Sequence, residues 1–221
     1  DRLHVDDQTV QRTSAVVTRT TTYVAAAGRI VHIQRLRSTG GQVEVNDEVS
    51  LPDTCLDVPR VGVVFTLPAT ASGPFDDLSW SGLGPGDSYP DRRAAVGLGR
   101  WQTAVRDQAV PFVVPQEFGL HLETRWFTIG NGTTAITVSP SRPMAFSALP
   151  WSTDDLALAT HPHHLPGRTT TFVHLDAAHR GLGTAACGPD TAERWRIAPG
   201  TFRWRYTVRA THSGAPPRVR R

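Results

Sequence analysis

A period-two alternation of apolar and polar residues constrains the fold of this chain more than any other feature. It is clearest in the first third, in four segments bounded by Gly, Asn, Asp or Pro: 14–25, 29–38, 42–51 and 60–69. Because successive side chains of a strand point to opposite faces, this pattern is typical of half-buried antiparallel strands joined by tight turns. Gly28, Gly40 and Gly41 lie at the junctions, where a hairpin needs positive φ.

The later part of the chain continues the β pattern. We expect strands at 119–130 and 133–140, separated by Asn131–Gly132, a strong hairpin dipeptide. A further strand is expected within 169–177, and 194–210 is predicted to fold back on itself at Pro199–Gly200.

Two local patterns refine this picture. Phe202, Trp204 and Tyr206 alternate along the last segment, and an aromatic face this regular is most often part of the core. Ser152 can cap a short helix near 152–160, with acidic residues at the positive end of the helix dipole. The sequence therefore predicts an all-β fold with one helix of about two turns.

The length of the chain fits one large β domain. With 221 residues and 24.1 kDa, we predict a single β-sandwich domain over residues 1–209 and a flexible basic tail over 210–221. The chain begins at Asp1 and its only Met is Met144, so we interpret it as an N-terminally truncated fragment of a larger enzyme. Residues 1–10 receive no assignment, and truncation there could leave a sheet edge prone to self-pairing.

Composition excludes several classes of partner. No apolar run is long enough to span a membrane, so we expect a soluble protein. All 23 cationic residues are Arg, but the net charge is only +3 and acidic residues interleave with them, which argues against nucleic-acid binding. Cys55 and Cys187 match neither a metal spacing nor a disulfide framework, and Cys55 is interpreted as a buried or half-buried free thiol in a reducing compartment.

The sequence contains none of the common catalytic or cofactor-binding motifs that would make the chain an enzyme by itself. It contains no GxSxG, Gly-rich phosphate loop, HExxH or CxxC. The adjacent carboxylates Asp76–Asp77 and Asp154–Asp155 point to different faces, so neither pair suits a catalytic acid and base. His161, His163 and His164 could be a metal site, but Pro162 and a loop setting promise no tetrahedral geometry, so no metal site is predicted.

One glycine-rich stretch with two tryptophans carries a family resemblance. WSGLGPGDSYPDR at 80–92 is similar to a loop in the C-terminal β-sandwich domain of bacterial β-galactosidases of glycoside hydrolase family two. Four further segments resemble the same domain in the same order, so that the resemblance spans about residues 13–209: VPRVGVVFTLP at 58–68, PFVVPQEFGLHLETRW at 111–126, LDAAHRGLGTAACGPD at 175–190 and APGTFRWRYTV at 198–208. The resemblance implies a large antiparallel supersandwich of the galactose-mutarotase-like type.

The resemblance also implies an activity whose chemistry lies outside this chain. Family members are retaining glycosidases that hydrolyse terminal β-D-galactosides such as lactose, using a Glu pair, Mg²⁺ and Na⁺ on a preceding TIM barrel. No catalytic or metal-binding residue is therefore expected here, and this fragment alone should be inactive. The expected partners are the sugar, the enzyme's own barrel and further copies in a homo-oligomer, in the cytoplasm.

In the family, the loop after Gly-x-Gly places a Trp at the mouth of the sugar pocket. The matching position here is Cys187, in a loop that is one residue shorter, and a thiol offers less stacking area than an indole. Cys187, His179 and Arg180 are the candidate substrate-binding residues. The alternatives are a small apolar side chain packed under the loop for Cys187 and structural hydrogen bonds for the other two.

The 79–101 stretch supplies further candidates. Trp80, Tyr89, Asp91 and Trp101 could contact a sugar or the barrel, although a well-packed structural loop is the preferred interpretation. Two rival functions remain. One is a stand-alone carbohydrate-binding module with Trp80, Trp101 or Trp126 as its sugar platform, and the other is a purely structural interaction domain.

Overall fold

The computed structural model describes residues 3–167, 169–183 and 188–212 and shows two antiparallel sheets. The larger has nine strands in the order β1-β2-β3-β4-β13-β10-β9-β6-β7, and the smaller has four in the order β5-β12-β11-β8. The strands of the larger sheet are β1 His4–Arg12, β2 Val17–Ala25, β3 Gly28–Thr39, β4 Gln42–Leu51, β6 Asp77–Gly84, β7 Gly97–Ala104, β9 Trp126–Gly130, β10 Thr134–Pro140 and β13 Gly200–His212. Those of the smaller are β5 Arg60–Leu67, β8 His121–Thr124, β11 Met144–Leu149 and β12 Thr171–His179. The predicted all-β sandwich is confirmed.

The alternation in the sequence becomes an alternation of burial along the strands, as β4 shows. In β4, Val45, Asp47, Val49 and Leu51 are buried while the residues between them are half-buried. The Asp47 carboxylate is buried among these residues, but it has a hydrogen-bond partner, since it accepts from Gln34 Nε2 at 3.0 Å. The period-two pattern therefore positions the strands as predicted.

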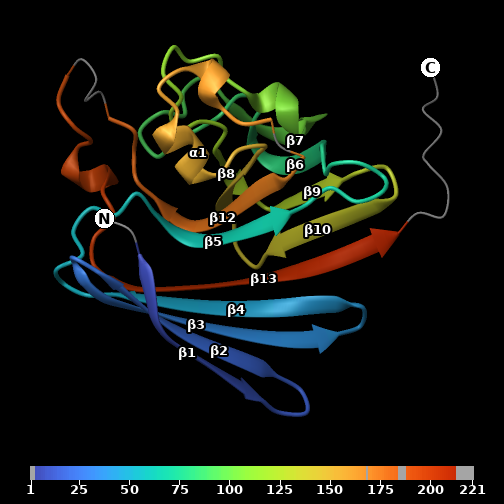
Figure 1. Cartoon of the computed structure of the whole chain (residues 1–221), viewed down its shortest axis with the longest axis vertical. Helices are drawn as coiled ribbons and strands as arrows, with labels where there is room; N and C mark the ends of the chain where they lie inside the picture. The colour runs from blue at the N-terminus through green and yellow to red at the C-terminus, as the bar shows by residue number, and fades with distance from the viewer. Residues whose placement is uncertain (1–2, 168, 184–187, 213–221) are drawn as a thin grey trace.

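The core lies between the sheets, and large aromatic side chains fill it. Phe127 of the larger sheet stacks on Phe146 of the smaller sheet, with ring centroids 4.6 Å apart. Tyr206 of β13 meets Phe65 of β5 edge to face at 5.9 Å. Trp204 and Tyr206 are buried, as predicted from the alternating aromatic face. Figure 1 shows β13 running as one long strand beside β4, with β5 and β12 on the other side of it.

The 79–101 stretch forms the β6–β7 hairpin and a long connection. Trp80 and Trp101 stand directly opposite each other across the two strands. A Cβ atom on Gly84 or Gly99 would come within 2.7 Å of the Trp101 ring. The glycines of this stretch therefore make room for an indole against the backbone, which explains why both residue types occur together.

One predicted strand is wrong in detail. The segment 119–130 divides into β8 and β9, which belong to different sheets, because the chain bends between them at Arg125. The Arg125 N–H donates to the Ser81 carbonyl at 2.8 Å and so fixes the bend. The predicted turn at Asn131–Gly132 between β9 and β10 is confirmed.

The C-terminal segment is one strand and not a hairpin. Residues Glu193–Trp195 form a short 3₁₀ helix, η3, and β13 begins only at Gly200. The whole length of β13 is needed to pair with β4 over its first part and with β10 over its last part. It extends to His212, so residues 210–212 of the predicted tail belong to the strand, and 213–221 lie outside the described residues.

The single predicted helix is confirmed as α1, Thr153–Leu158. The Ser152 hydroxyl accepts from the Asp155 N–H at 3.1 Å, and the Asp155 carboxylate accepts from the Ser152 N–H at 2.9 Å. These reciprocal bonds form a capping box. Leu156 then packs against Phe118 and Leu149 in a small satellite core.

Two further strands were not predicted from the sequence: the first lies mostly in residues 1–10, which had no assignment, and the second shows no alternation. Residues 4–12 form β1, an edge strand whose nine residues are all exposed. Met144–Leu149 forms β11, which is buried on both faces and therefore shows no alternation. Two short 3₁₀ helices complete the secondary structure of the described part: η1 Val105–Gln108 and η2 Pro162–His164. Cys55 is a buried free thiol, as expected.

Candidate functional site

The Gly-x-Gly loop after β12 is held in place by Asp91. Both oxygens of this carboxylate accept backbone hydrogen bonds, from Leu182 N–H at 3.0 Å and from Gly183 N–H at 2.8 Å. A Cβ on Gly181 would lie 2.5 Å from the Asp91 Cγ, and Gly183 has a φ of +66°. Both glycines are therefore required, one for the close approach and one for the backbone conformation. Asp91 thus joins the β6–β7 connection to this loop.

Four charged side chains brace the other end of the loop. Arg180 pairs with Asp57 at 3.3 Å and with Asp190 at 2.9 Å, and Arg196 pairs with the same two carboxylates at 3.7 and 3.4 Å. The Thr191 N–H, followed by the charges of Arg180 and Arg196, lowers the pKa of Asp190 below its usual value. Arg180 therefore takes part in structural ion pairs and donates a hydrogen bond to Asp190, and its contact with a substrate stays a prediction.

His179 lies at the start of the same loop, and its side chain is only 4% exposed. Its Nδ1 lies 2.7 Å from the Arg180 carbonyl, which can only accept, so Nδ1 carries the proton. Its Nε2 lies 2.9 Å from the Arg60 guanidinium, which can only donate, so Nε2 is the acceptor. The ring thus links β5 to the loop and positions it.

A buried polar cluster continues behind His179. Arg60 pairs with Glu117 at 2.9 Å, and the Tyr89 hydroxyl donates to the same carboxylate at 3.3 Å. Burial raises the pKa of Tyr89 and also raises the pKa of Asp176 to about 6, against the opposing charge of Arg60. The cluster therefore joins β5, β12 and the two long connections that carry Tyr89 and Glu117.

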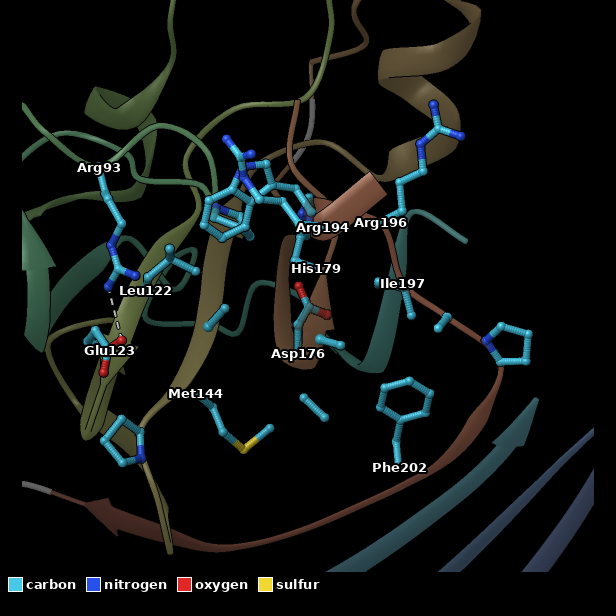
Figure 2. A pocket seen from close by; sticks show the side chains of 18 residues that line it. Arg93, Leu122, Glu123, Met144, Asp176, His179, Arg194, Arg196, Ile197 and Phe202 are labelled. Carbon is cyan, nitrogen blue, oxygen red and sulfur yellow. Dashed lines mark hydrogen bonds and ion pairs between the residues drawn. The ribbon is translucent and has the colours of Figure 1, made fainter. Parts of the chain in front are cut away.

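A cleft of about 530 Å³ opens beside this cluster. Figure 2 shows Asp176 and His179 at its centre, Arg194 and Arg196 on one side and the Arg93–Glu123 ion pair on the other. The Asp176 carboxylate is 1% exposed, and the Arg60 Nε lies 3.6 Å from its Oδ2. The other carboxylate among the described lining residues is Glu123, and it is paired with Arg93 at 3.0 Å.

The aromatic residues predicted to contact a sugar or the barrel differ in how deeply they are buried. Trp80 is 1% exposed and donates its indole N–H to the Leu83 carbonyl at 3.0 Å, and Tyr89 is fully buried. Both rings are packed inside the domain, and a sugar or barrel contact by Trp80 or Tyr89 stays a prediction. Trp101 and Trp126 are half-buried, with the Trp101 N–H bonded to the Gly82 carbonyl. Cys187 lies outside the described residues.

Several residues of this site were missed by sequence reasoning. They are the partners that brace the loop and fill the buried cluster: Asp57, Arg60, Glu117, Asp176, Asp190, Thr191 and Arg196. Most lie inside the segments that carry the family resemblance, which was the signal available. Among the described residues, one group of three possible metal ligands has its ligand atoms within 4.8 Å of one another, namely His161, His163 and His164.

Taken together, the fold and the site define an all-β sandwich domain that holds a braced Gly-x-Gly loop beside a cleft lined by residues of both sheets. Within the described residues, no helix is long and apolar enough to span a membrane. Residues 2–209 match the family model described as beta galactosidase small chain, and the chain belongs to this family.

Comparisons with named relatives agree with the family. The chain is 35% identical over 147 residues to a β-galactosidase of Arthrobacter sp. (strain B7), covering 64% of this chain and 14% of that protein. It is 30% identical over 185 residues to a β-galactosidase of Vibrio vulnificus (strain YJ016), covering 82% of this chain and 17% of that protein. The chain thus spans less than a fifth of the length of these curated relatives and corresponds to a C-terminal-type domain within them.

Solved structures with a similar fold were also found. One is a galactose mutarotase-like protein from Lactobacillus casei ATCC 334, with a TM-score of 0.47 and 14% identity over 93% of this chain and 73% of that one. Another is a galactose mutarotase related enzyme from Lactobacillus acidophilus, with a TM-score of 0.47 and 9% identity over 98% and 73% of the two chains.

Proposed function

We propose that this chain is the C-terminal domain of a retaining β-galactosidase and forms one wall of its sugar site. The observation that carries the proposal is the clamp of Asp91 on Leu182 and Gly183, because it fixes the loop that leads to Cys187. These two charge-assisted hydrogen bonds and the four-charge network hold the described residues on either side of 184–187, next to which a neighbouring domain would lie.

The chemistry of the reaction would lie outside this chain. The substrate is a terminal β-D-galactoside such as lactose, and a Glu pair on a TIM barrel would perform the double displacement. One Glu attacks the anomeric carbon, while the other protonates the leaving oxygen and then activates water. This domain contributes a wall that restricts water and orients the leaving group, with Cys187 as the side chain that faces the site.

The metal ions proposed for the whole enzyme, Mg²⁺ and Na⁺, do not fit the candidate ligands of this chain. The one group of candidate ligands in its described residues consists of three imidazoles, whereas Mg²⁺ prefers oxygen ligands. The ions would therefore bind elsewhere in the enzyme. A cytoplasmic location and a homo-oligomeric enzyme complete the proposal.

An assay with a chromogenic β-galactoside tests this function. We expect the full-length protein with magnesium present to hydrolyse the substrate, and this chain alone to be inactive. Activity in the isolated chain, or none in the full-length protein, would show that the proposal is wrong. Calorimetric titration of the isolated chain with lactose should give no heat of binding, whereas a stand-alone carbohydrate-binding module would bind the sugar.

The role of the loop is tested by two variants of the full-length protein. Cys187→Trp adds a stacking surface and should lower KM for aryl galactosides, since an aromatic contact contributes about 0.5–1.5 kcal/mol. Cys187→Ala is the matched control and should change KM less. If both variants left every kinetic constant unchanged, Cys187 would not face the site.

A further inference from the structure

The turn after α1 brings three histidines together in the connection between β11 and β12. Residues Pro162–His164 form the 3₁₀ helix η2, with Pro162 in its first turn. The His164 N–H donates to the His161 carbonyl at 3.0 Å, and the Leu165 N–H donates to the Pro162 carbonyl at 3.1 Å. The sequence predicted a loop without fixed geometry for residues 161–164, whereas the structure shows a hydrogen-bonded turn there.

The imidazole rings of His161, His163 and His164 form a compact group. Their ring centroids are 5.3, 5.2 and 4.3 Å apart in the three pairs. One ligand nitrogen from each ring can be chosen so that all three lie within 4.8 Å of one another. All three side chains are exposed, so an ion can reach them from solvent.

Thr160 orients two of these rings. Its Oγ1 lies 3.2 Å from His161 Nδ1 and 3.0 Å from His164 Nδ1. A hydroxyl oxygen has two acceptor lone pairs, so both Nδ1–H groups can donate to it at once. In that arrangement Nε2 of each ring would be the nitrogen that binds a metal ion, and the hydroxyl would be the hydrogen-bond partner that usually orients a metal-bound histidine.

The turn is also anchored on both sides. Before it, α1 packs on the satellite core through Leu156, and after it, Leu165 joins the same core. The Trp151 indole N–H donates to the Pro166 carbonyl at 3.0 Å, which closes the segment. The three rings therefore project from a segment whose backbone is already held, so little ordering is needed on binding.

From this arrangement we propose that His161, His163 and His164 bind one divalent transition-metal ion, with Zn²⁺ as the reference ion and water as its fourth ligand. Zn–N bonds of about 2.0–2.1 Å place the nitrogens of a tetrahedral site about 3.4 Å apart, which small rotations of exposed rings achieve. An all-imidazole set suits Zn²⁺, Cu²⁺ and Ni²⁺, and it does not suit Mg²⁺ or Ca²⁺. The site is independent of the β-galactosidase proposal.

Calorimetric titration of the chelator-stripped full-length protein with ZnCl₂ tests the site. We compare it with a variant that carries His161→Ala, His163→Ala and His164→Ala. The unaltered protein should bind one Zn²⁺ more per chain than this triple variant. The matched control, His4→Ala with His212→Ala, removes two exposed histidines on β1 and β13 and should bind like the unaltered protein.

Two further measurements examine the geometry. Thr160→Val should weaken Zn²⁺ binding by about 10- to 100-fold, the usual loss when a partner of a metal-bound histidine is removed, while Thr160→Ser should retain it. Co²⁺ should give visible absorption bands of a tetrahedral site that are missing in the triple variant. Equal Zn²⁺ stoichiometry and affinity in the unaltered protein and the triple variant would overturn the proposal, because any bound ion would then lie elsewhere.

Discussion

Replacing Asp91 by Ala should loosen the Gly-x-Gly loop without unfolding the sandwich. The substitution removes the acceptor of both the Leu182 and the Gly183 N–H. A hydrogen bond to a charged group contributes about 1.5–3 kcal/mol, but Asp91 is exposed and water can replace part of each bond. Taking about 1 kcal/mol for each bond gives about 2 kcal/mol, or about a 30-fold larger open population of the loop.

Hydrogen exchange measured by mass spectrometry can detect this change. Peptides covering residues 180–183 and 188–192 should lose about 30-fold of their protection in the Asp91→Ala variant, whereas peptides of β4 and β12 should not change. Asp91→Asn retains one acceptor oxygen, so the protection of these peptides should lie between that of Asp91→Ala and that of the unaltered protein. Asp107→Ala is the matched control, because this exposed carboxylate makes only a 3.8 Å ion pair with Arg106.

The same variant also links the loop to activity. In the full-length protein, Asp91→Ala should lower kcat/KM for an aryl galactoside if the braced loop forms a wall of the sugar site. The physical reasoning about the clamp would be refuted if exchange in residues 180–183 were the same in Asp91→Ala, Asp107→Ala and the unaltered protein.

Other substitutions and pH should act on the sandwich itself. Phe146 is fully buried and stacked on Phe127, so Phe146→Ala should lower the free energy of unfolding by about 3–5 kcal/mol in urea titrations; a loss below 1 kcal/mol would contradict its place in the core. Ser152→Ala removes the capping box of α1 and should reduce the same free energy by about 1 kcal/mol, with Ser152→Asp, another good cap, as the control. Burial lowers the pKa of His121 to about 4, so the neutral ring favours the folded state. Its stabilising contribution is complete above about pH 6.5 and falls by about 3 kcal/mol as pH decreases through 4. Urea midpoints measured between pH 7.5 and 4.5 should show this decline, and His121→Gln should flatten it; equal slopes in the two proteins would exclude His121 as the cause.

Local patterns in the sequence were sufficient for much of the fold. The strands β2 to β5 were predicted because each has one face toward the core and one toward solvent, which imposes alternation. Ser152 marked the start of α1 because a capping side chain acts within three residues of itself. Such features depend on neighbours along the chain and can be predicted from one sequence.

The errors arose where distant segments decide the structure. β11 has no alternation because β8 and β12 flank it and both of its faces are buried. The bend between β8 and β9 depends on Glu123, whose φ of +57° is rare for a residue other than glycine, and on a hydrogen bond to Ser81. The alternation of residues within 119–130 predicts neither the φ of Glu123 nor the hydrogen bond to Ser81.

The candidate site shows the same division. The family resemblance directed attention to Asp91, His179 and Arg180, all of which the structure brings to the Gly-x-Gly loop. Their actual partners come from far away in the chain, since Asp57 is 123 positions before Arg180. For the same reason, the burial of Trp80 could not be deduced from its glycine-rich surroundings.

The one-residue crossing between β8 and β9 limits how this domain can change in length. Arg125 alone separates a strand of the smaller sheet from a strand of the larger one. Inserting or deleting one residue within 121–130 would turn the buried side chains of one strand outward, because a shift of one position exchanges the two faces. At Gly40–Gly41, where nothing lies within 4 Å of an added Cβ, an insertion would only lengthen a hairpin tip. We therefore expect natural length variation among such domains to gather at hairpin tips of this kind and to avoid the β8–β9 crossing.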